Sequence, residues 1–357
     1  MCKQLFILCT LFLITASCNR KAETHPRDSS PTLAGINPLL PAGADPWATY
    51  VNGTYYYTQG CEDRIILWKT TNITDLKNAE KKEVWLPKDD DNAHHLWGPE
   101  IHFLNNKWYI YFSADNGNTD NHQIYVIENS SPDPLHGEFV MKGRIATDAD
   151  NNWAIHASVF EHAGELYMIW SGWQSRRIET ENQCIYIASM ENPWTLKSNR
   201  VLLSKPEWEW ERQWISPDGS KTAYPIYVNE APRFFQSKNK DKLFIFYSAS
   251  GRWTPYYALG MLTADTGNNL LDAASWTKSP EPVFKQNAEN KVYAPGSICF
   301  IPSLDGKETW FIYHARRIPN DPPGAVDSRS PRIQKQEWDA KGMPVLGIPA
   351  AEGKIQL

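Results

Sequence analysis

The sequence predicts an all-β fold, a five-bladed β-propeller, on three observations. An aromatic-rich strand that ends in a small or polar residue occurs five times, at Gly53–Thr58, Lys107–Ala114, Glu165–Gly172, Lys242–Ala249 and Thr309–Ala315. Successive copies lie roughly 50 to 80 residues apart, a period typical of propellers and about the length of one four-stranded blade. Gly and Pro are frequent, and long runs of helix-forming residues are absent.

Shorter strands are expected between the repeats, because apolar and polar residues alternate there between Gly, Pro, Asn and Asp. These segments are Ile65–Lys69, His122–Glu128, Cys184–Ser189 and Ala258–Leu262. Short helical turns are expected at Asp75–Asn78 and Asp272–Trp276. The sequence shows no inter-domain linker after about residue 35, so residues 36–357 are predicted to form one propeller domain.

Charge and composition argue against some classes of binding partner. The chain has 357 residues, a net charge of -5 and no cluster of Lys and Arg, which argues against a nucleic-acid partner. The body contains no apolar run of membrane-spanning length. The 16 Trp residues would mostly fill the space between sheets, and some could offer flat faces to sugar rings.

The N-terminus has the features of a secretory signal peptide at residues 1–17. Lys3 provides a positive start, Leu5–Thr15 is apolar but too short to span a bilayer, and small residues precede Cys18. A cysteine in this position resembles a bacterial lipoprotein signal, with simple secretion as the alternative. Residues 18–35 would be a flexible tether. We therefore expect an exported protein, lipid-anchored through Cys18 in the cell envelope (periplasm or outer membrane), with no other contact to a membrane.

The cysteines predict neither a disulfide framework nor a zinc site. Of the six, Cys2 and Cys9 would leave with the signal and Cys18 would carry lipid. The remaining three are widely spaced and odd in number, and no CxxC or HExxH spacing is present. These three are Cys61, Cys184 and Cys299.

Two acids stand out from the rest of the chain. Asp45 lies between Gly43 and Trp47, where Pro46 favours an extended backbone, and Glu230 lies between Asn229 and Pro232. Asp45 alone is equally well explained as a turn residue, and Glu230 alone would by default be a surface residue. Together they suggest glycoside hydrolysis, which usually needs two carboxyl groups across the scissile bond. A propeller can bring residues so far apart in sequence to one axis.

Several motifs carry a family resemblance. They are Ala44–Trp47, Leu96–Glu100, Trp153–Ile155, Asn229–Pro232, the segment YSASGRWTPYYALGMLTAD, the segment SWTKSPEPVF and Arg329–Pro344. From about Asn37 to Pro349 the chain resembles glycoside hydrolase family 43, the five-bladed propeller arabinofuranosidases, xylosidases and arabinanases. It looks most like the exo-acting α-L-arabinofuranosidase branch. The resemblance implies hydrolysis of terminal α-L-arabinofuranosyl or related pentose residues in arabinose- or xylose-containing oligosaccharides from plant polysaccharides.

The resemblance also implies roles for individual residues. Asp45 matches the general base, Glu230 the general acid and Arg329 an arginine that contacts the sugar. His314 matches a histidine that in some members helps to hold a channel ion, often Ca²⁺; no cofactor is required for the reaction. Trp97 and Trp173 match pocket-lining positions that could stack on a sugar, with core packing as an equal alternative. Inversion would place the two carboxyl groups about 6.5–9.5 Å apart.

One position departs from the family pattern. The family usually has a third acid, which raises the pKa of the general acid, where this chain has His156 in Trp153–Ser158. A neutral histidine would supply no like-charge repulsion, and a protonated one would lower the pKa of Glu230. Two readings follow: a working enzyme with an altered third residue, helped by an acid such as Asp148 or Asp150, or a catalytically impaired sugar-binding lipoprotein.

The segment Glu207–Glu211 alternates Glu and Trp in the long interval between the third and fourth repeats. It would form either a rim over the pocket or a strand at a blade edge. The sequence does not separate these two alternatives.

Overall fold

The computed structural model describes residues 1, 34–88, 90–175, 181–215, 225–321 and 327–356. All of these except Met1 belong to one compact unit, Leu33–Leu357. The predicted signal peptide, Cys18 and most of the predicted tether lie outside the described residues. The unit begins with β1 at Ala34, just inside the stretch expected to be tether.

Three four-stranded antiparallel sheets follow the order of the chain. The first contains β2 (Trp47–Val51), β3 (Thr54–Thr58), β4 (Ile65–Thr70) and β5 (Glu80–Trp85). The second contains β6 (His94–Leu104), β7 (Lys107–Asp115), β8 (Gln123–Asn129) and β9 (Val140–Arg144). The third contains β19 (Tyr293–Pro302), β20 (Thr309–Arg316), β21 (Ser330–Trp338) and β22 (Pro344–Val345).

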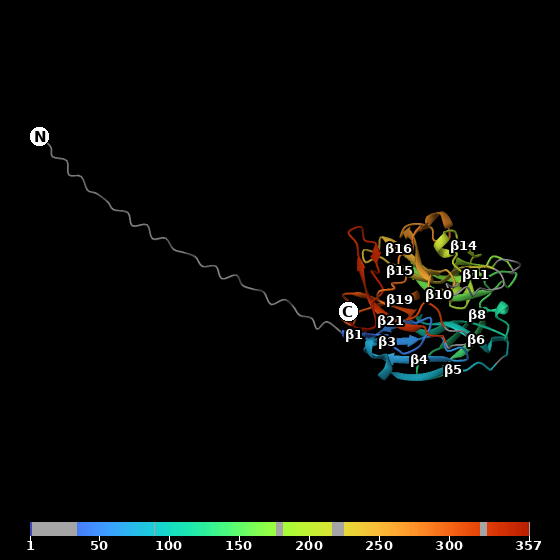
Figure 1. Cartoon of the computed structure of the whole chain (residues 1–357). Helices are drawn as coiled ribbons and strands as arrows, with labels where there is room; N and C mark the ends of the chain where they lie inside the picture. The colour runs from blue at the N-terminus through green and yellow to red at the C-terminus, as the bar shows by residue number, and fades with distance from the viewer. Residues whose placement is uncertain (2–33, 89, 176–180, 216–224, 322–326, 357) are drawn as a thin grey trace. The chain divides into compact units, whose positions relative to one another are not determined.

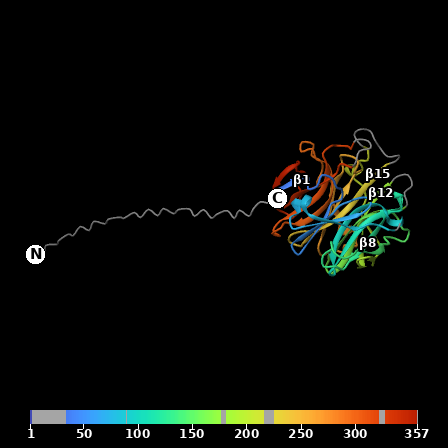
Figure 2. The ribbon, with the colours of Figure 1, turned by 90° about the horizontal axis from the view of Figure 1, so that it is seen from below.

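The middle of the chain forms one nine-stranded sheet. Its first part contains β10 (Ala154–His162), β11 (Glu165–Trp173), β12 (Glu181–Asn192), β13 (Thr195–Leu196) and β14 (Val201–Ser204). Its second part contains β15 (Ile226–Gln236), β16 (Lys242–Ala249), β17 (Ala258–Asp265) and β18 (Thr277–Lys278). A short parallel pairing of β12 with β15, which lie side by side in Figure 2, joins the two parts. The other pairs among the described strands of this sheet are antiparallel.

Little else is regular in the described part of the chain. Strand β1 (Ala34–Asn37) pairs with β23 (Gly353–Gln356), which ties the start of the unit to its end. Five 3₁₀ helices are present: η1 (Ile73–Asn78), η2 (Asp90–Asn92), η3 (Thr119–Asn121), η4 (Glu209–Glu211) and η5 (Ala273–Ser275). The predicted helical turns correspond to η1 and η5. None of these helices has the length and apolar character of a membrane span.

The prediction of a mostly β protein is confirmed, and all five aromatic repeats are strands. They form β3, β7, β11, β16 and β20, and each is the second of a run of consecutive antiparallel strands. Strand β7 is buried at every residue after Lys107. Its two faces are both covered, which explains why the repeats are almost continuously apolar and aromatic rather than alternating.

The first strand of each run contacts the first strand of the next. These contacts run from β2 to β6, β10, β15 and β19, and β19 in turn contacts β2. Figure 1 labels three of these strands, β10, β15 and β19, close together in the middle of the unit. Apolar side chains from adjacent sheets, including Trp108 and Trp170, fill the space between them. The described cysteines Cys61, Cys184 and Cys299 are free thiols, as the sequence predicted.

The same local distortion recurs near the start of each run. Asp45 precedes β2 and has a φ of 51°, while Gly98, His156, Ala231 and Ser297 have φ of 51°, 54°, 48° and 51°. The last four lie where the register of β6, β10, β15 and β19 with the following strand shifts. Such bulges re-aim side chains next to functional sites. Here they place the predicted site residues around a common space.

Candidate active site

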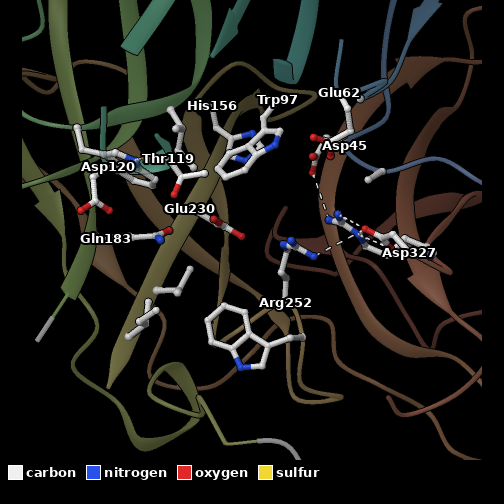
Figure 3. Close-up of a pocket in the computed structure, with 18 of the residues that line it drawn as sticks. Asp45, Glu62, Trp97, Thr119, Asp120, His156, Gln183, Glu230, Arg252 and Asp327 are labelled. Atoms are coloured by element: carbon white, nitrogen blue, oxygen red, sulfur yellow. Dashed lines mark hydrogen bonds and ion pairs between the residues drawn. The ribbon is translucent and has the colours of Figure 1, made fainter. Parts of the chain in front are cut away.

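The structure brings six predicted site residues together around one cavity of about 380 Å³. They are Asp45, Trp97, His156, Trp173, Glu230 and Arg329. Figure 3 shows the carboxyl groups of Asp45 and Glu230 facing the same open space, with His156 and Trp97 along one side. The seventh, His314, lies directly behind Asp45 and does not line the cavity.

Glu230 is a buried carboxyl group with one strong hydrogen bond. It lies on β15 with 8% of its surface exposed, and Tyr257 Oη donates to its Oε1 over 2.7 Å. Burial raises the pKa of Glu230 to about 7; the Tyr257 hydrogen bond opposes this rise, and the charge of Asp45 adds to it. Glu230 can therefore carry a proton close to neutral pH, as a general acid must.

Tyr257 is fixed by two close neighbours. Its ring is stacked near the ring of His314, with centroids 5.8 Å apart and an angle of 11° between the planes. On the other side Gly296 is so close that a Cβ at this position would lie 2.1 Å from Tyr257 Cε1. These contacts hold the phenol against Glu230.

Asp45 has the opposite electrostatic environment. Burial alone would raise its pKa, but the positive charges of His156, Arg329, His314 and Arg233 outweigh burial and hold the pKa well below its usual range. Both imidazoles are protonated only in acid, so the two arginines supply the positive charge at neutral pH. Asp45 is therefore ionised throughout the range in which Glu230 keeps its proton, which gives one base and one acid.

His314 orients Asp45. Its Nδ1 accepts a hydrogen bond of 3.0 Å from the backbone N–H of Asp45, and its Nε2 is buried without a hydrogen-bond partner. Burial and Arg329 lower the pKa of His314, so the ring is neutral. Because Nδ1 accepts, the proton of the neutral ring lies on Nε2, which then offers a donor rather than a lone pair.

In this arrangement His314 by itself does not form a metal site. A metal ligand needs a free nitrogen lone pair, and the described residues contain no group of three or more His, Cys, Asp or Glu suited to a metal. The Ca²⁺ expected for the channel stays a prediction.

Arg329 connects the base to a second acid. Its Nε donates to Asp327 Oδ1 and Oδ2 over 3.0 and 2.8 Å, and its Nη1 lies 4.0 Å from Asp45 Oδ1. Arg252, which also lines the cavity, lies 3.7 Å from Asp327 Oδ2 through its Nη1. A buried guanidinium fixed in this way can donate to sugar hydroxyl groups.

His156 occupies the position where the family pattern has an acid. Its backbone N–H donates to Ser113 Oγ over 3.0 Å, and its ring packs on Gly98, where a Cβ would lie 2.3 Å from Nδ1. Burial lowers its pKa to about 4, with Asp45 acting in the opposite direction. His156 is therefore neutral at neutral pH and does not lower the pKa of Glu230.

The acids suggested as replacements for the missing carboxylate are elsewhere. Asp148 accepts hydrogen bonds from Asp150 and Asn152 and pairs with Arg200 over 2.8 Å. Neither Asp148 nor Asp150 lines the cavity. The raised pKa of Glu230 comes from burial and from Asp45 instead.

Aromatic rings form part of the cavity wall. Trp97 stacks on His122 with ring centroids 4.0 Å apart, and Trp153 stacks on Trp173 with centroids 5.0 Å apart. Trp173 is only 3% exposed, so it supports Trp153 as well as lining the cavity. Both Trp97 and Trp173 line the cavity, and their stacking on a sugar stays a prediction.

Sequence reasoning missed several residues of the site. Trp153, Arg252, Trp253 and Asp327 line the cavity, and Tyr257 holds Glu230. Most of them lay in quoted motifs without receiving a role: the segment YSASGRWTPYYALGMLTAD contains Arg252, Trp253 and Tyr257. Asp327 lies two residues before Arg329, and that spacing was the available signal for their pairing.

The cavity therefore combines an ionised carboxylate, a protonated carboxyl group, a fixed arginine and tryptophan walls. This combination suits acid and base catalysis on a glycosidic bond.

Comparisons with known proteins agree with this chemistry. The model of the family described as "Glycosyl hydrolases family 43" matches residues 36–344. An "Extracellular exo-alpha-(1->5)-L-arabinofuranosidase" of Streptomyces avermitilis is 36% identical over 357 residues, which cover 97% of this chain and 69% of that protein. A protein of the same description from Streptomyces chartreusis is 36% identical over 286 residues, covering 79% of this chain and 82% of that protein.

A solved structure is also similar. The α-L-arabinofuranosidase of Lactobacillus brevis superposes with a TM-score of 0.80 at 33% identity, covering 89% of this chain and 98% of that chain. The match of the family model and the extent of these similarities lead to one conclusion: the chain belongs to glycosyl hydrolase family 43.

Proposed function

We propose that this glycosyl hydrolase is an exo-acting α-L-arabinofuranosidase. It releases terminal α-L-arabinofuranosyl residues from plant polysaccharide fragments. The observation that carries the proposal is the pairing of a protonated Glu230 with an ionised Asp45 in one tryptophan-lined cavity. The names and extent of the similar proteins support arabinofuranose as the sugar.

The proposed reaction is a single displacement with inversion. Asp45 takes a proton from water, whose oxygen bonds to the anomeric carbon. Glu230 gives its proton to the glycosidic oxygen as the bond from that oxygen to the anomeric carbon breaks. Arg329 holds the sugar hydroxyl groups, and the two carboxyl groups are expected to be about 6.5–9.5 Å apart. Both proton transfers use carboxyl groups, so the reaction needs no cofactor.

His156 fits this mechanism as a neutral wall residue. A catalytically impaired sugar-binding protein is less well supported, because burial and Asp45 keep the pKa of Glu230 near 7 without a third acid. The similar proteins named as arabinofuranosidases also favour hydrolysis.

We infer a propeller of five blades. The closed series of contacts among β2, β6, β10, β15 and β19 supports this number. The nine-stranded sheet would then contain two blades, joined by the short parallel pairing of β12 with β15.

We also propose export and a lipid anchor at Cys18. The apolar segment before Cys18 and the word "Extracellular" in the descriptions of two relatives support export. Labelling of expressing cells with an alkyne fatty acid tests the anchor. The full chain should be labelled and Cys18→Ser should not; equal labelling of both would contradict the anchor.

Hydrolysis is tested with the purified full chain and two substrates, an aryl α-L-arabinofuranoside and an aryl β-D-xyloside. We expect release from the arabinofuranoside, and NMR of the first product should show the inverted anomer. Asp45→Asn and Glu230→Gln should each lower kcat by about 10²–10⁴-fold. Failure to cleave either substrate, with folding verified by circular dichroism, would reject the proposal.

A further inference from the structure

A second cavity lies outside the active site. It has a volume of about 650 Å³ and shares no lining residue with the catalytic cavity. Its walls include Trp208, Trp210 and Tyr256, together with the amide side chains of Gln213 and Gln286. Aromatic faces beside amide groups are suited to carbohydrate, since sugars have both apolar faces and hydroxyl groups.

The aromatic groups of this cavity are unusually accessible. Trp208 is 41% exposed and is the one exposed tryptophan among the described residues, which include all 16 of the chain. Tyr256 is 40% exposed. Trp210 is fixed, because its Nε1 donates to the carbonyl oxygen of Pro280 over 2.9 Å. Large exposed aromatic side chains around a concavity are typical of binding sites.

The second cavity is connected to the active site by one loop. In this loop Arg252 and Trp253 line the catalytic cavity, Tyr256 lines the second cavity, and Tyr257 donates to Glu230. The segment that carries Trp208 and Trp210 is tied to the same loop, because Gly251 N–H donates to the Gln213 carbonyl oxygen over 2.8 Å. This loop therefore borders both cavities.

The segment that carries Trp208 and Trp210 is also anchored by the side chain of Glu211. Its buried carboxylate accepts hydrogen bonds from the backbone N–H of Trp208 over 2.9 Å and from Asn229 Nδ2 over 3.1 Å. Lys278 Nζ lies 2.8 Å from Glu211 Oε1. The backbone that carries Trp208 and Trp210 is therefore fixed before any ligand arrives, which lowers the entropy cost of binding.

We propose that this cavity is a secondary binding site for a neutral pentose polymer, namely the arabinan chain whose end enters the catalytic cavity. The identity of the polymer depends on the proposed function. Glu209 and Glu281 outnumber Lys285 among the charged groups of the cavity, which disfavours an acidic polysaccharide. The site holds the polymer near the active site and raises the local concentration of chain ends.

The test is affinity electrophoresis of the full chain in gels that contain linear arabinan. All proteins carry Asp45→Asn to prevent hydrolysis. Trp208→Ala should raise the dissociation constant by about fivefold or more, which corresponds to about 1 kcal/mol. Trp208→Phe, which keeps an aromatic face, should recover most of the affinity. Leu304→Ala is the matched control, because Leu304 is also 40% exposed but does not line either cavity.

Three results would overturn the proposal. They are unchanged arabinan affinity in Trp208→Ala, an equal loss in Leu304→Ala, and equal retardation by polygalacturonate. With Asp45 restored, Trp208→Ala should lower the ratio of kcat/KM on arabinan to kcat/KM on the aryl arabinofuranoside by about fivefold. The electrophoresis measures binding alone, so it reports on this site even if the proposed hydrolysis is absent.

Discussion

Tyr257 Oη lies 2.7 Å from Glu230 Oε1, and this hydrogen bond is the main polar contact that acts on the proposed general acid. A phenol hydrogen donated to a carboxyl oxygen stabilises the ionised form. It therefore limits how far burial raises the pKa of Glu230. The value of about 7 is a balance among burial, this hydrogen bond and nearby charges.

Tyr257→Phe should disturb this balance in one direction. Loss of the hydrogen bond raises the pKa of Glu230, so the alkaline limb of kcat/KM should move up by about one pH unit. Rates on an aryl α-L-arabinofuranoside between pH 5 and 10 measure the shift. Tyr50→Phe, in β2 and away from the cavity, is the control. A limb that stays in place or moves to lower pH would contradict this account.

Glu230→Gln should change the pH dependence of stability. The folded protein holds the Glu230 proton up to about pH 7, whereas the unfolded chain releases it near the ordinary value of 4.5. The native state thus binds more protons between these values, and the free energy of unfolding falls as pH rises, by about 3 kcal/mol for this group. Glu230→Gln removes this fall in the free energy of unfolding, because glutamine does not titrate.

Urea unfolding at pH 4 and pH 8 measures the effect. The effect of Glu230→Gln is the free energy of unfolding of the variant minus that of the unmodified protein. This difference should be about 3 kcal/mol more positive at pH 8 than at pH 4. The exposed Glu289, replaced by Gln, provides the control. An identical difference at both pH values would mean that the pKa of Glu230 is not raised.

Gly98→Ala tests the contact that positions His156. A Cβ at residue 98 would lie 2.3 Å from His156 Nδ1, and the φ of +51° costs an alanine more free energy than a glycine. The substitution should destabilise the protein by about 1–3 kcal/mol and lower kcat/KM. His156→Ala removes the clash, so the double variant should lose less stability than the sum of the single changes. If the stability loss of the double variant equals the sum of the losses of the single variants, the two residues do not interact.

Much of the architecture could be predicted from the sequence because the repeats are local. Each aromatic segment forms a strand from its own composition, and Lys107–Asp115 extends only one residue beyond the predicted Lys107–Ala114. The pairing of Asp45 with Glu230 could also be anticipated, through the family pattern. The Asn-Glu-Ala-Pro motif placed Glu230 near the cavity without showing which residues set its pKa.

The remaining features of the site depend on contacts between residues that are distant in sequence. Tyr257 and Glu230 are 27 residues apart, and the loop that carries Tyr257 was visible only as a motif without a role. One of the two readings of His156, that of a catalytically impaired site, considered this residue by charge alone. It omitted burial, which sequence does not report and which is the largest influence on the pKa of Glu230.

His156→Asp restores the acid that the family pattern has at this position. An additional carboxylate near Glu230 should raise its pKa further by repulsion, so the variant should remain active with its alkaline limb at higher pH. His156→Asn, which adds no charge, is the control. If only His156→Asp turns over substrate, the natural site is impaired and the account of His156 as a neutral wall residue is wrong.

The central claim is that burial and Asp45, without a third acid, keep Glu230 protonated near neutral pH. The pH profile of kcat/KM for the unmodified enzyme on an aryl α-L-arabinofuranoside tests this most directly. The account predicts activity that is level between about pH 5 and 6.5 and falls above it with an apparent pKa of about 7. An alkaline limb near pH 4.5, the ordinary value for a glutamic acid, would contradict it.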